Sequence, residues 1–370
     1  MSKKVAVLCA GLDNVLRGFE IHTRTLFNSL TEEKDASVVY HLYKRVGEES
    51  KTEIALHTPS RTSRIATILG RYRATRFYWE HLFFATKFIF HCRLRNKKYH
   101  SIVVIEPMVA NTLMKLRKLL PGNPKITFTH GVSIDPPAYI GFGDVIHEVS
   151  IENYHKMQAY LSQHNIKKEV RLIPHFLQTD VQSKLTKEEA RSKYGIQTPK
   201  LILSVGDVNR NNKRMDYLVN EVAHLPAEWG LVICGGVKTD DSKKIITEAQ
   251  EKLGDRFKHV YVPHHEIIDV YRMADVFVLC SLQEGFGMVN IEAMRAGLPI
   301  ILHRNELFRW ILKDDEWCVD MSKEGNLTAF LQKKLADENL LRNKGTENIQ
   351  LFHEHYLWEG VKKEYLDFIL

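Results

Sequence analysis

The stretch that decides the fold is residues 271–302, YRMADVFVLCSLQEGFGMVNIEAMRAGLPIIL. Its continuous apolar run at 276–279 predicts a strand that is buried on both faces, as in a parallel sheet. A polar, glycine-rich turn follows, and the pattern over 289–296 then predicts a helix before the next apolar run at 299–302. A strand, a turn, a helix and a second strand in this order predict a right-handed βαβ unit.

The turn carries the chemistry of this stretch. Glu284 stands at its mouth, and Glu292 follows eight residues later on the predicted helix, a little over two helical turns along. Free N–H groups at the start of a helix suit a diphosphate, and the glycines permit a close backbone approach. The residues that the turn and the helix start would offer to such a ligand are Gly285, Phe286, Gly287, Met288 and Val289.

The same alternation of strand and helix runs through the chain. Predicted strands are 5–9, 38–43, 101–106, 125–129, 144–149, 201–205, 230–234, 259–262, 276–279 and 299–302; predicted helices are 19–30, 215–222, 267–273 and 289–296. The series restarts near residue 200, with residues 174–200 as the connection. The fold class is therefore α/β, with two doubly wound domains that we expect to face a deep cleft. We expect the boundaries at 1–178 and 179–350, with a C-terminal helix in 351–370 that crosses back to the first domain.

Bulk composition indicates a globular protein without a membrane span. Of the 370 residues, 44% are hydrophobic and 26% are charged, and no run of about 18 apolar residues occurs. The start of the chain reads as a strand and not as a signal peptide. The five cysteines are scattered, without metal-ligand or redox spacing. We expect a cytoplasmic protein. A peripheral position on the cytoplasmic face of a membrane is compatible with this expectation.

The charge is distributed unevenly along the chain. Residues 1–178 hold 26 Lys and Arg against 15 Asp and Glu, whereas residues 179–370 hold 26 against 30. Segment 61–98 alone has ten basic residues and one acidic residue, Glu80, interleaved with aromatic side chains. Two interpretations stay open: an interfacial helix that binds an anionic membrane surface, and a core helix with a solvated basic flank. No RNA-binding motif accompanies the segment, so nucleic acid is not expected as a partner.

Three further positions lie where ligands bind in open parallel sheets, beyond the carboxyl ends of strands. Gly18 permits a turn into the helix 19–30, although a purely structural turn is an alternative interpretation. His130 follows the strand 125–129. Lys213 lies in the loop after the strand 201–205, where an ammonium would stabilise a developing negative charge, unless it is a plain surface charge.

Residues 271–302 resemble the signature of GT-B glycosyltransferases of family 4 (group 1), in which two glutamates separated by seven residues flank the G-F-G turn. Three other segments share the resemblance, namely LILSVGDVNRNNKRMDYL (201–218), VRLIPHFLQT (170–179) and the closing segment 352–366. The resemblance covers about 200 residues and weakens in the N-terminal half. It implies two Rossmann-like domains, a nucleotide-sugar donor, no cofactor and no catalytic metal.

By position in the family motif, Glu284 would hold the 3- and 4-hydroxyls of the donor sugar, Glu292 the ribose, and Lys213 the diphosphate. His130 would contact the donor sugar near C6 and the approaching acceptor.

Two positions depart from the family pattern. Asp207 stands where the family has an arginine, so Arg210 or Arg214 is expected to substitute for it, and Arg17 replaces the first of two glycines.

The sequence therefore predicts a retaining glycosyltransferase that builds a glycan or glycolipid and uses a UDP-sugar before other donors. A lipid-linked or small-molecule acceptor is equally compatible with the sequence. Two alternatives stay open: another reaction on the same fold, such as nucleotide-sugar epimerisation, and a non-catalytic sugar-binding scaffold.

Overall fold

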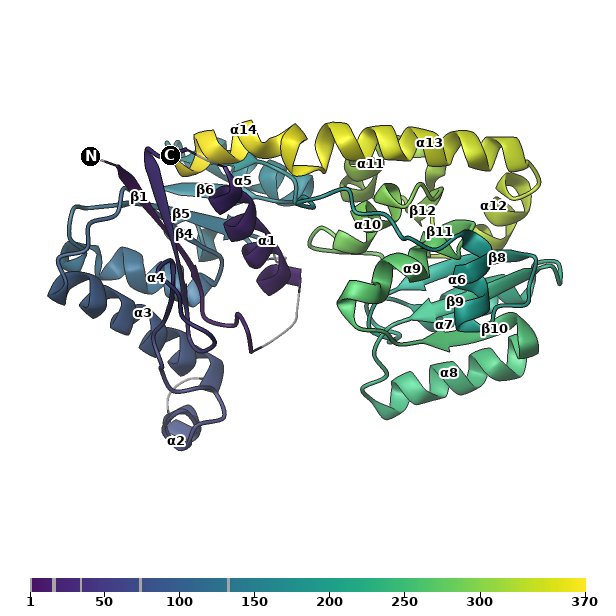
Figure 1. Ribbon diagram of the computed structural model, residues 1–370, viewed down its shortest axis with the longest axis horizontal. Coiled ribbons are helices and arrows are strands. Elements are labelled where there is room, and N and C mark those ends of the chain that lie inside the picture. Colours follow the sequence, from purple (N-terminus) through teal and green to yellow (C-terminus); the bar gives the residue numbers. More distant parts are fainter. Residues whose placement is uncertain (1, 15–17, 34, 73–74, 132–133) are drawn as a thin grey trace. The chain divides into compact units, whose positions relative to one another are not determined.

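The computed structural model describes the chain except for residues 1, 15–17, 34, 73–74 and 132–133. The chain folds into two compact units (Figure 1). Unit 1 comprises residues 1–178 and 361–370, and unit 2 comprises residues 179–360. The division after residue 178 coincides with the predicted boundary. Each unit is a parallel sheet covered by helices.

Unit 1 is built on a seven-stranded sheet in the order β3-β2-β1-β4-β5-β6-β7, and every pair is parallel. Its strands are β1 (Lys3–Cys9), β2 (Val38–Lys44), β3 (Glu53–Ala55), β4 (Ser101–Val104), β5 (Lys125–His130), β6 (Val145–Glu148) and β7 (Glu169–Leu172). Because the strand order reverses between β1 and β4, this sheet has its topological switch point there.

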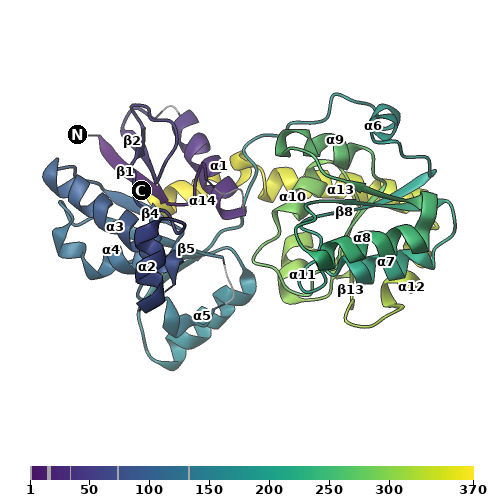
Figure 2. The ribbon, with the colours of Figure 1, turned by 90° about the horizontal axis from the view of Figure 1, so that it is seen from below.

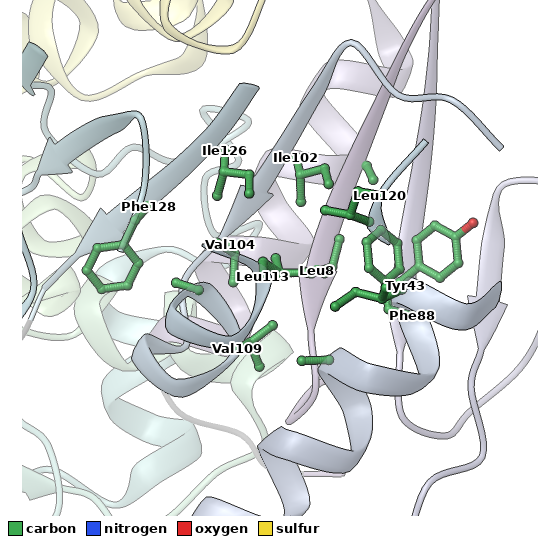
Figure 3. Packing of buried hydrophobic residues seen from close by; sticks show 14 of the residues in the cluster. Leu8, Tyr43, Phe88, Ile102, Val104, Val109, Leu113, Leu120, Ile126 and Phe128 are labelled. Atoms are coloured by element: carbon green, nitrogen blue, oxygen red, sulfur yellow. The ribbon is translucent and has the colours of Figure 1, made fainter. Parts of the chain in front are cut away.

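Helices cover both faces of this sheet. They are α1 (Gly18–Glu32), α2 (Arg64–Tyr72), α3 (Arg76–Leu94), α4 (Pro107–Lys115), α5 (Ile151–Gln163) and α14 (Trp358–Ile369). On one face, Phe88 of α3 and Val109 and Leu113 of α4 pack against Leu8 and Val104 of the central strands (Figure 3). All five side chains are fully buried, so the strands that end at the switch point rest on a rigid core.

Unit 2 repeats this plan with a six-stranded parallel sheet in the order β10-β9-β8-β11-β12-β13. Figure 2 shows this unit from a second side. Its strands are β8 (Lys200–Val205), β9 (Trp229–Cys234), β10 (Phe257–Val260), β11 (Val276–Leu279), β12 (Ile300–His303) and β13 (Cys318–Val319). Its helices are α6 (Lys187–Tyr194), α7 (Met215–Ala223), α8 (Asp240–Leu253), α9 (Ile267–Arg272), α10 (Met288–Arg295), α11 (Glu306–Leu312), α12 (Asn326–Lys334) and α13 (Glu338–His355). The switch point lies between β8 and β11.

The C-terminal segment forms two helices where the sequence predicts one. Helix α13 ends at His355, and α14 begins at Trp358. Helix α14 packs on unit 1, where the Tyr365 hydroxyl donates to the carbonyl of Pro174 at 3.0 Å and Lys125 donates to the carbonyl of Phe368 at 3.1 Å. The closing helix therefore belongs to the first unit from residue 361 onward.

The basic segment 61–98 forms α2 and α3. Phe84, Phe88 and Ile89 of α3 are fully buried, so one face of this helix is a core face. Apolar side chains also remain exposed on both helices, namely Ile65, Ile68, Phe77, Phe90 and Leu94. Both interpretations of the segment thus find support in different side chains of the same two helices. No helix in the described part of the chain is long and apolar enough to cross a bilayer.

Candidate active site

The second sheet presents an ion pair at its switch point. Glu284 lies in the loop after β11, Lys213 lies in the loop after β8, and the Lys213 ammonium binds the Glu284 carboxylate. The exposed fractions of the two side chains are 14% for Lys213 and 11% for Glu284. The structure therefore brings together two predicted site residues that are 71 positions apart in the sequence.

The backbone around Lys213 is shaped to hold this side chain. Asn209 Oδ1 accepts hydrogen bonds from the amides of Asn212 and Lys213 at 2.8 and 2.9 Å, which fixes the turn. Gly206, with φ of 147°, lies directly under the Lys213 stem, and a Cβ there would meet Lys213 Cε at 3.0 Å. A side chain at position 206 would crowd the Lys213 stem in a backbone conformation that favours glycine.

The turn before α10 adopts the conformation that its glycines predict. Gly287 has φ of 85°, which favours glycine, and it is the N-cap of α10. The amide groups of Met288 and Val289 lie in the first turn of this helix, where no intrahelical acceptor exists. The Phe286 ring is buried and packs edge-on against Trp310 and Tyr356, with both ring-centroid distances at 6.2 Å. Any contact of residue 286 with a donor would therefore use its backbone.

Glu292 is held in a buried network on α10. The Tyr271 hydroxyl donates to one of its carboxylate oxygens at 2.8 Å, and His264 Nε2 lies 3.7 Å from the other. Burial works to raise the pKa of Glu292, but the contacts with His264 and Tyr271 outweigh it and lower this pKa. The same contact with Glu292 raises the pKa of His264. Glu292 is thus held ionised, as an acceptor for hydroxyl groups.

Neither Arg210 nor Arg214, the arginines expected to substitute at the phosphate position that Asp207 occupies, is free of partners in the structure. Asp207 pairs with Lys238 at 2.8 Å, which offsets its charge. The Arg210 guanidinium binds three carboxylates, those of Asp216, Asp241 and Glu248. Arg214 lies over the Tyr217 ring at 4.3 Å and bonds the carbonyl of Met321. Of the predicted cations, Lys213 is therefore the one that the structure places beside a predicted donor-binding carboxylate.

The first sheet carries a separate cavity of about 360 Å³ beside its switch point. Cys9 at the end of β1, Glu106 after β4 and His130 at the end of β5 all line it. Phe19 of α1 and Phe77 of α3 contribute aromatic walls. The predicted site residue His130 thus lies at a hollow of the size range that binds small molecules.

His130 is oriented by a buried carboxylate that the sequence analysis missed. Its Nδ1 lies 2.8 Å from Glu148 Oε2, and the Tyr139 hydroxyl donates to Glu148 Oε1 at 2.8 Å. The Tyr139 ring stacks on His130 with centroids 3.8 Å apart. With the Glu148 carboxylate as acceptor, the tautomer that carries its proton on Nδ1 presents Nε2 as an acceptor. Among the described residues, no group bonds to Nε2.

Glu106 is the second acidic group that the sequence analysis missed. One oxygen accepts the amide of Ala10 at 2.6 Å and that of Gly11 at 3.4 Å, which bridges the switch point. The other oxygen is buried and has no partner in the described part of the chain. Burial raises the pKa of Glu106 to about 7, against the opposing effect of the two backbone amides. A carboxylic acid at the end of an apolar strand is the signal that a reader of the sequence could have used.

One other predicted feature stands apart from this cavity's polar groups. Gly18 is the exposed first residue of α1, and a Cβ there would contact nothing within 4 Å. Arg17 lies outside the described residues. Among the residues that the structure describes, no group of three or more His, Cys, Asp or Glu side chains is arranged to hold a metal ion.

Comparison with known proteins agrees with this arrangement. Residues 186–351 match the family described as "Glycosyl transferases group 1". Mannosylfructose-phosphate synthase of Agrobacterium fabrum is 26% identical over 197 residues, which cover 50% of this chain and 43% of that protein. The curated relative is thus matched over less than half of its length.

Solved structures match along nearly the whole chain. Sucrose-phosphate synthase from Thermosynechococcus elongatus superposes with a TM-score of 0.77 at 20% identity, over 99% of this chain and 98% of that one. Anabaena Alr3699/HepE, in complex with UDP and glucose, gives a TM-score of 0.72 at 12% identity, over 99% and 98% of the two chains. Likeness at these identities shows the fold.

The fold is therefore that of the GT-B glycosyltransferases, with two Rossmann-like units. Over residues 186–351, the protein is similar to the glycosyl transferases group 1 family. The assignment to family 4 within this class stays a prediction from the sequence motif.

Proposed function

We propose that the protein is a retaining glycosyltransferase that moves a hexose or N-acetylhexosamine from a nucleotide-sugar to a glycan, glycolipid or small-molecule acceptor. The observation that carries this proposal is the Lys213–Glu284 ion pair at the switch point of the second sheet, beside the N-terminus of α10. The group 1 family match over the same unit supports it. UDP is the first nucleotide to test, because a structural neighbour is described with UDP and glucose.

In this proposal the bound donor replaces the contact between Lys213 and Glu284 with its own contacts to each of the two side chains. Sugar hydroxyls donate to Glu284, and the diphosphate takes the Lys213 ammonium and the first amides of α10. Glu292 accepts the ribose hydroxyls. As the bond from the anomeric carbon to the phosphate oxygen breaks, the ammonium stabilises the leaving charge. The acceptor oxygen bonds to the anomeric carbon on the same face, and its proton passes to the leaving phosphate, so no cofactor and no metal take part.

The acceptor side falls to unit 1 in this proposal. Its cavity holds His130, and its helices α2 and α3 carry exposed apolar side chains among basic ones. A glycan or a lipid-linked acceptor fits such a unit, the latter with the protein at an anionic membrane surface.

Calorimetric titration with UDP, GDP and ADP, each with and without EDTA, tests the donor site. We expect one nucleotide to bind without metal. Glu292→Ala should weaken its binding by at least about tenfold, since a hydrogen bond to a charged group is worth roughly 1.5–3 kcal/mol. Glu251→Ala, on the exposed surface of α8, is the matched control and should bind normally. Failure of all three nucleotides would favour the non-catalytic scaffold.

Turnover separates an enzyme from a binding protein. Lys213→Ala should lower kcat for transfer or for donor hydrolysis by about 10²–10³, the cost of removing one group that stabilises a developing anion. Its circular dichroism spectrum should match that of the unaltered protein. If turnover is unchanged, Lys213 does not act on the leaving group, and the proposed chemistry is wrong.

A further inference from the structure

The cavity of unit 1 has the polar groups of a binding site and lacks a counter-charge for an anion. Glu106 and Glu20 both line it, and Glu148 lies behind His130. Among the described residues that line it, none is Lys or Arg. Arg61 lies over the Phe77 ring at 4.6 Å, but its guanidinium pairs with Glu80 at 2.7 Å. A phosphate in this cavity would be desolvated among carboxylates without compensation, which is costly.

The unpartnered atoms of the cavity are hydrogen-bond acceptors. One oxygen of Glu106 and Nε2 of His130 are buried, and no described residue bonds to either of them. Buried polar atoms are almost always satisfied, so an unpaired pair of acceptors in a hollow marks a place for donors from a ligand. Hydroxyl groups are neutral donors that suit both atoms.

The remaining walls are aromatic and come from elements far apart in sequence. Phe19 stands on α1, Phe77 on α3 and Phe128 on β5. Flat apolar faces combined with a few fixed acceptors are typical of sites that bind the C–H face of a ring and orient its hydroxyls.

We propose that this cavity binds an uncharged, hydroxyl-rich ring of the acceptor, a neutral sugar or cyclitol unit, and that it excludes the phosphorylated form of such a ring. One hydroxyl donates to Glu106 and another to Nε2 of His130, while an aromatic wall covers the apolar face. This inference rests on the proposed glycosyl transfer and adds the class of acceptor to it.

The cavity also assigns a role to part of the basic aromatic segment. Phe77 belongs to α3, and its exposed fraction is 39%, so its ring is half-buried against the hollow. Its neighbour His81 lies 4.1 Å away between ring centroids and lines the same cavity. The start of α3 thus forms acceptor-site wall, whereas Phe90, further along the same helix, is outside it.

Ligand-observed NMR and calorimetry on the full chain test the proposal. The probes are methyl α-glucoside, methyl α-mannoside, N-acetylglucosamine and myo-inositol as neutral rings, with glucose 6-phosphate as the phosphorylated one. We expect at least one neutral ring to bind and glucose 6-phosphate to bind more weakly. If no neutral ring binds at millimolar concentration, or if glucose 6-phosphate binds more tightly, the proposal is overturned.

Two variants place the binding in the cavity. Glu106→Gln keeps the shape but puts an amide donor where the ionised acid accepts. It should therefore weaken binding of the neutral ring by about tenfold or more at pH 8, above the Glu106 pKa of about 7. Phe77→Ala should weaken it through loss of the wall. Phe90→Ala, an exposed aromatic on the same helix, is the matched control and should leave affinity unchanged. Normal affinity in both cavity variants would overturn the proposed site.

Nucleotide titrations on the same samples distinguish failure of the acceptor-site inference from failure of the proposed glycosyl transfer. If UDP binds, Glu292→Ala weakens its binding and no neutral ring binds, the acceptor inference alone is overturned. Binding of neutral rings without binding of any nucleotide sinks the proposed transfer reaction and leaves a neutral-sugar site.

Discussion

Glu106 shows how one side chain can be both a structural bridge and a poised acid. Its first oxygen ties the end of β4 to the backbone after β1, and its second oxygen is buried without a described partner. Burial raises the pKa of Glu106 from an ordinary value of 4.5 to about 7. In the unfolded chain the group would ionise near its ordinary value. Its contribution to stability is therefore full below pH 4.5 and is lost as the pH rises through 7.

Glu106→Gln should change the pH dependence of stability. The amide imitates the protonated acid and does not ionise. Between pH 5 and pH 8 the free energy of unfolding of the variant should therefore rise relative to that of the unaltered protein, by up to about 3 kcal/mol. Urea unfolding at both pH values measures the difference. Glu48→Gln, on an exposed loop of the same unit, should show no such gain. Parallel pH profiles for Glu106→Gln and the unaltered protein would show that Glu106 ionises normally in the fold.

At the residue scale, position in the family motif predicted Lys213 and Glu284 as site residues but predicted neither Glu148 nor Tyr139. The first two lie on loops that a family motif marks. Glu148 ends an apolar strand. Its side chain contacts His130 because β5 and β6 pair side by side in the register His130↔Glu148. A contact made by strand register is invisible before the order of the strands is known.

Helix α14 rests on a cluster of buried histidines in unit 1. The rings of His22 and His175 lie 3.8 Å apart, and Tyr365 of α14 lies 6.1 Å from His22 between ring centroids. Burial lowers the pKa of His22 to about 3 and that of His147 to about 4, and it holds the pKa of His175 well below its usual value. These histidines must stay neutral for the cluster to remain packed.

Acid should therefore loosen this helix before it affects unit 2. The unfolded chain binds protons near pH 6.5 and the folded cluster does not, so stability is full above pH 6.5 and falls as the pH drops toward 4. His22 alone accounts for on the order of 3 kcal/mol at pH 4. As the pH falls from 7 to 4, the rate of amide hydrogen exchange relative to the intrinsic rate should rise in α14 but not in α8.

His22→Phe should reduce this acid sensitivity, and His164→Gln, an exposed histidine at the end of α5, should leave it as it is. Protection of α14 that stays constant from pH 7 to pH 4 would mean that the histidines are charged or hydrated in the native fold.

At the element scale, long apolar runs predicted their strands well, and short edge strands escaped. The run 276–279 coincides with β11. In contrast, β7 carries Glu169 and Arg171, and the sequence analysis predicted no strand there. Edge strands such as β3, β7 and β13 pair on one side only, so they need no continuous apolar run. Their formation depends on the neighbour strand and not on their own pattern.

At the scale of the whole molecule, the basic excess of the first half is joined to exposed apolar side chains. Ile65 and Ile68 of α2 are 54% and 56% exposed, and Leu94 of α3 is 84% exposed. Arg64 and Arg71 stand on α2 with the two isoleucines. Apolar side chains flanked by arginines suit the interface of an anionic bilayer.

We expect the protein to sediment with vesicles that contain phosphatidylglycerol and not with phosphatidylcholine vesicles. Binding should fall as NaCl rises from about 0.05 to 0.5 M, because salt screens the exposed charges. The double change Ile65→Ser and Ile68→Ser should weaken binding by about tenfold or more. Val181→Ser, at a similarly exposed position in unit 2, serves as the control. No binding to either lipid would favour the plain core-helix interpretation of segment 61–98.

The five cysteines, all buried and unpaired, make the molecule well suited to site-directed labelling. Burial raises the pKa of Cys92 and Cys318 to about 12 and that of Cys234 to about 11, which leaves almost no reactive thiolate near neutral pH. A cysteine introduced on the surface of each unit would therefore react selectively with a fluorophore or spin label, without removal of any native thiol. Distances between two such labels, with and without nucleotide, would measure the separation of the two units in each state.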